Sequence, residues 1–238
     1  MVSGQQGVNN TGGAAATTCY LCQMHFPVSL HRLPVLFLVV SASTASAADY
    51  RVDPARSLLV VRTAKDGPAA RLAHNHVVVA KDLSGTLKYD PANPDACAVS
   101  VTVDARTLIL DDPAMRKKFG ETSVLSRGDV EDVRKAMLAE DQLYVARFPH
   151  LTFLSSKVTR AADGTYVVSG HLTLRGSAQP VSFPATVEAA ADGTVTARGT
   201  FTVKQTQFGW KPYSAMFGAV RNKDEVTFII ELVAVPAV

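Results

Sequence analysis

The amino-acid sequence predicts a mainly all-β fold, an antiparallel β-barrel with a short helical insertion between strands. In about eight or nine segments, apolar and polar residues alternate with a period of two, as in strands with one buried face. Short turn signals separate these segments, and residues 111–149 lack the alternation. Short turns favour antiparallel neighbours, and closing such a sheet removes its unpaired edges. A barrel is therefore favoured over a sandwich.

The first 47 residues differ from the rest of the chain. Arg32 is their only Lys, Arg, Asp or Glu, and it precedes an apolar run, Leu33–Val40, and small residues that end in Ala45-Ser46-Ala47. This order is typical of an export signal. We expect residues 1–47 to be a leader and signal peptide removed before Ala48, and residues 48–238 to be the mature domain, periplasmic or secreted.

The start of the chain leaves one alternative open, because Met24 is as plausible a start as Met1. The apolar run is shorter than the ~18 to 20 residues of a membrane-spanning helix, so no transmembrane segment is predicted. Cys19 and Cys22 form a C-x-x-C within the leader, which we interpret as coincidence. Cys97 is the only cysteine of the mature chain, and its apolar neighbours predict a buried, unreactive thiol.

The strand pattern is clearest where valines alternate with polar residues. Val99, Val101 and Val103 alternate with Ser100, Thr102 and Asp104. The pattern recurs at Leu87/Tyr89, Leu151/Phe153, Leu172/Leu174, 181–188 and 226–232. The turn signals between strands include Asp163-Gly164, Arg175-Gly176 and Asp192-Gly193, and the last predicts a tight hairpin.

Residues 111–149 interrupt the strands. Val130, Val133, Met137 and Leu138 fall at helical spacing. Asp129 is a suitable N-cap residue, so we expect a helix of about three turns that begins there and closes one mouth of the barrel. The acidic pairs of this stretch, such as Asp111-Asp112, are interpreted as exposed carboxylates that serve solubility and helix ends rather than as catalytic groups.

Four segments of the mature chain resemble one known family in sequence and in order. They are residues 50–57 (YRVDPARS), 82–91 (DLSGTLKYDP), 148–158 (FPHLTFLSSKV) and 168–176 (VSGHLTLRG). They are similar to motifs of the YceI-like family of exported lipid- and polyisoprenoid-binding barrels, with Leu83 in place of an aromatic residue. The resemblance implies an extended lipocalin-like barrel that holds a polyisoprenoid or other long-chain amphiphile without catalysis, for transport, storage or stress protection.

The alternation identifies the side chains that we expect to line the interior of the barrel. Such a lumen would bind an apolar chain with little polar chemistry. An aromatic-rich run, residues 208–217, is expected either to line the mouth of the lumen or to plug the end of the barrel. The predicted lining residues are Val99, Val101, Val103, Leu172, Leu174, Phe183, Val187, Phe201, Val203, Trp210, Phe217, Val226, Phe228 and Ile230.

Histidines are the candidate polar groups. His74 and His76 are two residues apart, so in a strand they would point to the same side. With His171 they are candidates for contact with a ligand head group or for the barrel mouth. A metal held by His74 and His76 is the less favoured alternative, because an H-x-H pair alone is a weak zinc signal.

Composition excludes several other classes. The formal charge of +3 arises from 24 basic and 21 acidic residues that are scattered along the chain, so nucleic acid is not an expected partner. The sequence has no G-x-S-x-G, H-E-x-x-H or P-loop motif, and no enzyme is predicted. No cofactor is expected beyond a bound isoprenoid or fatty-acid-like lipid. A homodimer and a non-catalytic envelope stress scaffold that binds its partner through the insertion both remain open.

Overall fold

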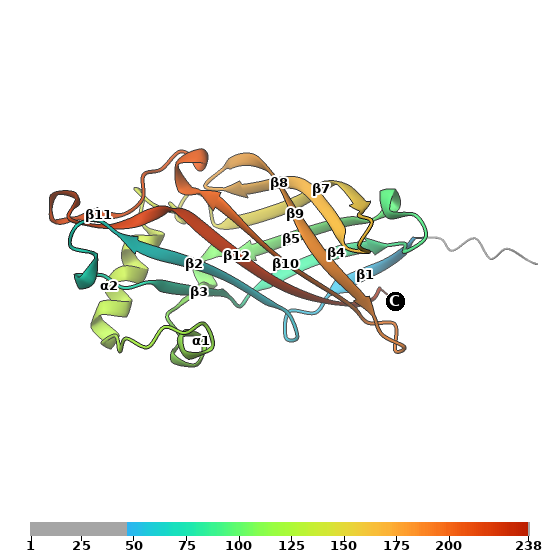
Figure 1. Cartoon of the computed structure of the whole chain (residues 1–238), viewed down its shortest axis with the longest axis horizontal. Helices are drawn as coiled ribbons and strands as arrows, with labels where there is room; N and C mark the ends of the chain where they lie inside the picture. Colours follow the sequence, from blue (N-terminus) through green and yellow to red (C-terminus); the bar gives the residue numbers. More distant parts are fainter. Residues whose placement is uncertain (1–46, 238) are drawn as a thin grey trace, which may run out of the picture. The chain divides into compact units, whose positions relative to one another are not determined.

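The computed structural model describes residues 47–237, which form an antiparallel β-barrel (Figure 1). The predicted leader, its cysteine pair and the alternative start lie outside the described residues. None of the described helices is long and apolar enough to cross a membrane. The strands are β1 (Ala48–Val52), β2 (Leu58–Asp66), β3 (His76–Ala80), β4 (Leu83–Tyr89), β5 (Ala98–Asp104), β6 (Ile109–Leu110), β7 (His150–Arg160), β8 (Tyr166–Leu174), β9 (Ser177–Ala189), β10 (Val195–Lys204), β11 (Ser214–Ala215) and β12 (Val220–Pro236).

The barrel closes through its first and last strands. Neighbouring strands follow the order β1-β4-β5-β7-β8-β9-β10-β12, and β1 pairs again with β12. Tyr50 lies opposite Pro236, and Val52 lies opposite Ala234. The result is the eight-stranded antiparallel barrel that the alternation predicts. The hairpins predicted at Asp163-Gly164, Arg175-Gly176 and Asp192-Gly193 connect β7 to β10 in sequence order.

Three barrel strands are interrupted, so eleven of the twelve segments build eight positions, and the short β11 pairs with β12 outside this order. β2 pairs with β12 beyond the point where β1 does, so β1 and β2 occupy one position in the barrel. In the same way β3 shares a position with β4, because β3 pairs with β2, and β6 shares a position with β5, because β6 pairs with β3. The breaks lie at residues 53–57, 81–82 and 105–108. Beyond β6 the wall is completed by the helical insertion rather than by another strand.

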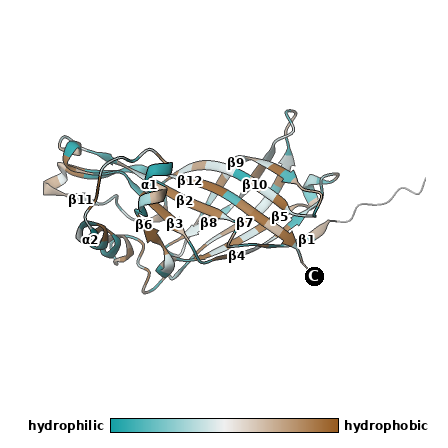
Figure 2. Cartoon of the chain, turned by 90° about the horizontal axis from the view of Figure 1, so that it is seen from below, coloured by the Kyte–Doolittle hydropathy of each residue, from teal (hydrophilic) through white to brown (hydrophobic). Residues whose placement is uncertain are grey.

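Apolar residues recur along the barrel strands (Figure 2), and the residues that line the inside of the barrel are mostly apolar, as the period-two pattern predicts. Buried clusters run along the inside, and one contains Val52, Val78 and Val101 while another contains Leu172, Trp210 and Phe228. A smaller cluster lies on the outer face, where α1 (Pro113–Lys118) and the residue after it cover Val60 and Val77 with Met115 and Phe119. The cysteine predicted to be buried, Cys97, is buried.

The insertion contains two helices instead of one. The longer, α2 (Arg127–Leu138), places Val133 and Met137 against the barrel core, as their spacing predicts. Its predicted start at Asp129 is wrong: Ser126 is the N-cap, and its hydroxyl accepts from the Asp129 N–H at 3.1 Å while the Asp129 carboxylate accepts from the Ser126 N–H at 3.3 Å. This capping box moves the start three residues toward the N-terminus.

The shorter helix was not predicted. Asp112 caps α1 by accepting from the N–H groups of Ala114 and Met115, and Pro113 occupies its first turn. Proline at this position costs no hydrogen bond because the first N–H groups of a helix have no partner within it. Asp112 therefore serves a helix end, as expected for this acidic pair, whereas the expected exposure of Asp111 is wrong because its carboxylate is buried.

Close strand packing at Gly85 gives a test of the fold. A Cβ atom at this position in β4 would overlap the Ser100 carbonyl oxygen of β5 and lie 3.1 Å from Cγ2 of Val52. We predict that Gly85→Ala lowers the free energy of unfolding by roughly 1–3 kcal/mol, because the added methyl group overpacks the space between the strands. Urea denaturation measures the change.

Gly128→Ala is the matched control, because the nearest atom to a Cβ there is the Ser126 Oγ at 3.8 Å, on the exposed side of α2. That substitution should leave stability unchanged or raise it by up to ~1 kcal/mol, given the helix propensities of the two residues. If Gly85→Ala behaves like Gly128→Ala, the strand pairing of β4 with β5 is described wrongly.

Candidate functional site

The barrel encloses a cavity of about 580 Å³ that is lined mostly by apolar side chains. Its walls come from the barrel strands and from Val133, Ala136 and Met137 of α2. The volume lies within the ~300–1,000 Å³ of small-molecule sites. The helix thus forms part of the wall at one end, next to β11 and the segment between β2 and β3 (Figure 1).

Most of the residues predicted to line the lumen do line the cavity. These are Val99, Val101, Val103, Leu172, Leu174, Phe183, Val187, Phe201, Trp210, Val226, Phe228 and Ile230.

Two of the predicted residues lie elsewhere. Val203 is buried, but it packs in a cluster with Phe208 and Trp210 near the end of β10 and is not part of the cavity wall. Phe217 is fully exposed (113%), so the prediction that it lines the lumen is wrong. It lies in a turn with φ 55° between β11 and β12, where the alternation of a strand no longer determines which way a side chain points.

Four phenylalanine rings form a continuous row on the cavity wall. Phe183 stacks on Phe201 with ring centroids 4.6 Å apart, and Phe201 stacks on Phe228 at 4.9 Å. Phe153 of β7 joins Phe183 of β9 at 5.7 Å, although β8 lies between their strands. The intervening residue is Gly170, where a Cβ would lie only 2.8 Å from Phe153 Cζ. The row presents an aromatic surface to whatever occupies the cavity.

The histidines do not come together as one group. His74 and His76 both line the cavity, although His74 lies in the loop before β3 and not in a strand with His76. His171 is exposed on the outer face of β8, because its neighbour Leu172 points inward; its placement at the mouth is wrong. Among residues 47–237, no three His, Cys, Asp or Glu side chains gather as metal ligands. The metal alternative therefore gains no third ligand for His74 and His76.

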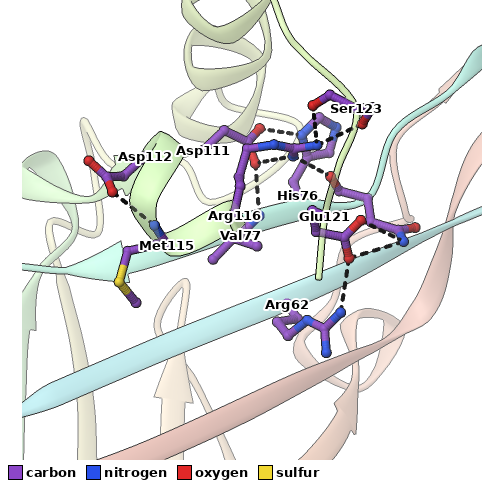
Figure 3. A network of polar contacts seen from close by, with 10 residues as sticks. Arg62, His76, Val77, Asp111, Asp112, Met115, Arg116, Glu121 and Ser123 are labelled. Carbon is purple, nitrogen blue, oxygen red and sulfur yellow. Dashed lines mark hydrogen bonds and ion pairs between the residues drawn. The ribbon is translucent and has the colours of Figure 1, made fainter. Parts of the chain in front are cut away.

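His76 is held by a buried ion-pair network in the barrel wall (Figure 3). Its Nδ1 lies 2.6 Å from Asp111 Oδ2, and Asp111 Oδ1 accepts from Arg116 Nη1 at 2.8 Å and from the Val77 N–H at 3.0 Å. The side chain of Asp111 is inaccessible to solvent. Because Nδ1 faces the carboxylate, a neutral His76 carries its proton there and keeps Nε2 as an acceptor.

The network also joins the insertion to the strands. Arg116 of α1 donates to the Asn75 carbonyl at 2.8 Å and to Ser123 Oγ at 2.8 Å. Glu121 accepts from Arg62 Nη2 of β2 at 2.9 Å and from the Asn75 side chain at 3.2 Å. The residues between β6 and α2 are therefore tied to β2 and β3 by charge-assisted hydrogen bonds, which are stronger than neutral ones.

Asp111 remains ionised despite its burial. Burial by itself would raise its pKa, but the hydrogen bonds from His76, the Val77 N–H and Arg116 outweigh that effect and hold the pKa below its usual value. The buried carboxylate thus balances the charge of Arg116.

Thr63 is a second polar group beside His76 in the cavity wall. It lies directly across from His76 in the β2–β3 pairing, and both residues line the cavity. Its buried Oγ1 has no hydrogen-bond partner among the described residues. Thr63 therefore makes no contact of the nucleophile–base kind with the His76–Asp111 pair.

Two tyrosines add polar atoms to the cavity toward the β1 end. Tyr89 Oη lies 3.4 Å from Tyr166 Oη, and Cys97 lines the same region. Burial raises the pKa of the Tyr89 hydroxyl and of the Cys97 thiol. Both groups are therefore neutral at physiological pH and suit an apolar lumen.

Sequence reasoning missed Phe153, Thr63, Asp111, Arg116 and the tyrosine pair. Phe153 lies in an alternating run, so the period-two pattern could have found it. No local signal marks Asp111 as buried, because its partners His76 and Arg116 come from the strand β3 and from α1.

A family comparison agrees with this architecture. Residues 50–234 match the model of the YceI-like domain, most of the chain. The chain belongs to the YceI-like domain family. This confirms the resemblance on which the four sequence segments agree.

Two similar proteins carry the name UPF0312 protein. A UPF0312 protein of Pseudomonas putida F1 is 29% identical over 149 residues, which is 62% of this chain and 66% of that protein. A UPF0312 protein of Shewanella putrefaciens is 30% identical over 148 residues, with the same shares. The match thus spans just under two thirds of the length of these relatives.

Solved structures of two bacterial proteins share the fold. BcnA of Burkholderia cenocepacia superposes with a TM-score of 0.57 at 22% identity, over 76% of this chain and 98% of that one. A polyisoprenoid-binding domain from Saccharophagus degradans, implicated in plant cell wall breakdown, superposes with a TM-score of 0.52 at 12% identity. The superposition covers 81% of this chain and 100% of that domain. At these identities the likeness is one of fold.

The buried carboxylate predicts a pH dependence of the YceI-like domain. Because the pKa of Asp111 is lower in the folded than in the unfolded state, its stabilisation is complete above the unfolded value near ~3.9 and is lost as pH falls through the folded value. Asp111→Asn should lower stability at neutral pH by about 3–5 kcal/mol, since Arg116 stays buried without its carboxylate. The substitution should also make the loss of stability with falling pH less steep. Denaturation at a series of pH values measures both effects.

Asp49→Asn is the control, because the carboxylate of Asp49 is exposed and its ion pair with the exposed Lys88 is long, at 3.6 Å. Its loss should change stability by less than ~1 kcal/mol. Equal losses for Asp49→Asn and Asp111→Asn at neutral pH would contradict the role given to the buried network.

Proposed function

We propose that this YceI-like domain binds a polyisoprenoid or another long-chain amphiphile inside its barrel and carries out no catalysis. The observation that carries the proposal is the mostly apolar cavity of about 580 Å³ inside the barrel, with its row of stacked phenylalanine rings. Each buried methylene of a lipid chain contributes ~0.8 kcal/mol, so such a lumen needs few polar contacts for affinity.

The polar groups of the wall support an amphiphile rather than a plain hydrocarbon. His74, His76 and Thr63 meet the cavity toward the end where α2 lies, and Tyr89 and Tyr166 meet it at the other end. A head group that both donates and accepts hydrogen bonds would find the free His76 nitrogen and the unpaired Thr63 hydroxyl at hand. The polyisoprenoid-binding domain of Saccharophagus degradans, which shares the fold, supports the same ligand class.

Export remains part of the proposal. The signal-like features of residues 1–47 support a periplasmic or secreted protein, and β1 starts at Ala48, the residue expected to follow cleavage. An exported lipid-binding barrel suits lipid transport, storage or protection under stress.

Native mass spectrometry and Trp210 fluorescence test the ligand directly. Trp210 is buried in the cavity wall and donates to Gln205 Oε1 at 3.1 Å, so a lipid beside it should shift its emission. With geranylgeraniol or palmitic acid as the probe, we expect one lipid-sized adduct and a saturable emission change. Neither signal from either probe, and no lipid carried over from the expression host, would refute the proposal.

A lumen-blocking variant localises the ligand. Val99→Trp fills the cavity from β5 and should weaken probe binding by at least about tenfold, because the chain loses buried contact. Ser100→Trp adds the same side chain to the outer face of β5, where Ser100 pairs with the exposed Leu154, and should bind as wild type does. Native mass spectrometry compares the variants after circular dichroism confirms their folding. Equal binding by both variants would place the ligand outside the lumen.

A further inference from the structure

Two loops lie together at the end of the barrel where α2 packs. Residues 67–73 follow β2, and residues 209–219 precede β12 (Figure 1). The Ala69 N–H donates to the Ala219 carbonyl at 2.8 Å, which joins the loops. Leu72 and Tyr213 of these loops also line the cavity. The loops therefore form part of the rim of the lumen.

This rim exposes large apolar side chains. Phe217 is fully exposed (113%), Met216 is 61% exposed, Leu72 is 59% exposed and Tyr213 is 43% exposed. We call these four side chains the apolar rim. The other exposed large apolar residues of the described chain, Ile109, Val124 and Leu154, lie in three separate elements or loops. Scattered single residues are ordinary, but a gathered apolar patch marks an interaction site.

The backbone holds two of these side chains outward by an unusual conformation. Met216 and Phe217 have φ values of 51° and 55°, in the left-handed region that bulky residues rarely adopt. Such local strain is retained where the surrounding structure imposes it, and it is concentrated at functional positions. The turn presents Phe217 to solvent although a regular strand ending would not.

The charges of the two loops are all positive. Residues 67–73 and 209–219 contain Arg71 and Lys211, both exposed, and no Asp or Glu. Arg221 at the start of β12 is paired with Asp66 at 2.9 Å. Basic residues beside exposed aromatic and apolar ones are the composition that binds the interface of an anionic bilayer.

We propose that the apolar rim docks on the surface of an anionic lipid bilayer, with Phe217 and Met216 entering the interface between head groups and acyl chains. Docking there sets the rim of the lumen against the membrane, so a lipid chain passes between bilayer and cavity without crossing water. This inference rests on the proposed lipid binding and adds the site where the cargo is exchanged.

Vesicle co-sedimentation with a matched pair of variants tests the proposal. The probe is a vesicle of equimolar phosphatidylcholine and phosphatidylglycerol. The double substitution Met216→Ser and Phe217→Ser should weaken vesicle binding by at least about tenfold, because it removes the side chains that enter the interface. Leu154→Ser removes an equally exposed apolar side chain (61%) from the wall of the barrel and should bind as wild type does. Vesicles of phosphatidylcholine alone should bind wild type less tightly.

Two further readouts separate this inference from lipid binding itself. Geranylgeraniol binding in solution should be unchanged in the double variant, since Met216 and Phe217 lie outside the cavity wall. The rate of geranylgeraniol transfer from vesicles should fall. Vesicle binding by the double variant equal to wild type, or an equal loss in Leu154→Ser, overturns the proposal. So does a wild-type dimer that ignores vesicles and becomes a monomer in the double variant, because the rim then binds a second copy.

Discussion

The architecture depends on the pairing of the first strand with the last. β12 is long enough to pair with β10 along one edge and with both β2 and β1 along the other. Without the pairing of β12 with β1 and β2, the sheet would have two open edges and its apolar inner face would have no enclosure. Closure turns alternating residues into a lumen, so the cavity follows from one set of backbone hydrogen bonds.

The opening at the helical end depends on a second constraint, the carboxylate of Asp111. Beyond β6 the wall continues through α2, while α1 covers the outer face, and neither helix is held by strand pairing. Asp111 gathers His76, the Val77 N–H and Arg116 around one buried charge. A buried charge is costly unless it is fully paired, so this arrangement fixes the helical insertion in one position. The same contacts orient a histidine nitrogen at the cavity wall.

The sequence allowed the barrel and most of its lining to be predicted because period-two alternation is local. Val99, Phe183 and Phe228 face inward for the same reason that their polar neighbours face out. The predictions for Asp129 and Phe217 failed where alternation or local spacing was not the deciding factor, whereas alternation itself places His171 on the outer face beside the inward Leu172. The helix start was decided by a capping box with Ser126, and Phe217 lies in a left-handed turn. Asp111 was not predicted to be buried because two of its partners, His76 and Val77, lie 35 and 34 residues away in sequence.

The most direct test of a lipid inside the lumen is a crystal structure of the protein grown with geranylgeraniol. The account predicts elongated electron density along the rings of Phe153, Phe183, Phe201 and Phe228, with its polar end beside His76 and Thr63 or beside Tyr89 and Tyr166. A map with ordered water alone in the lumen, or with the lipid seated on the outer face of the barrel, would contradict it.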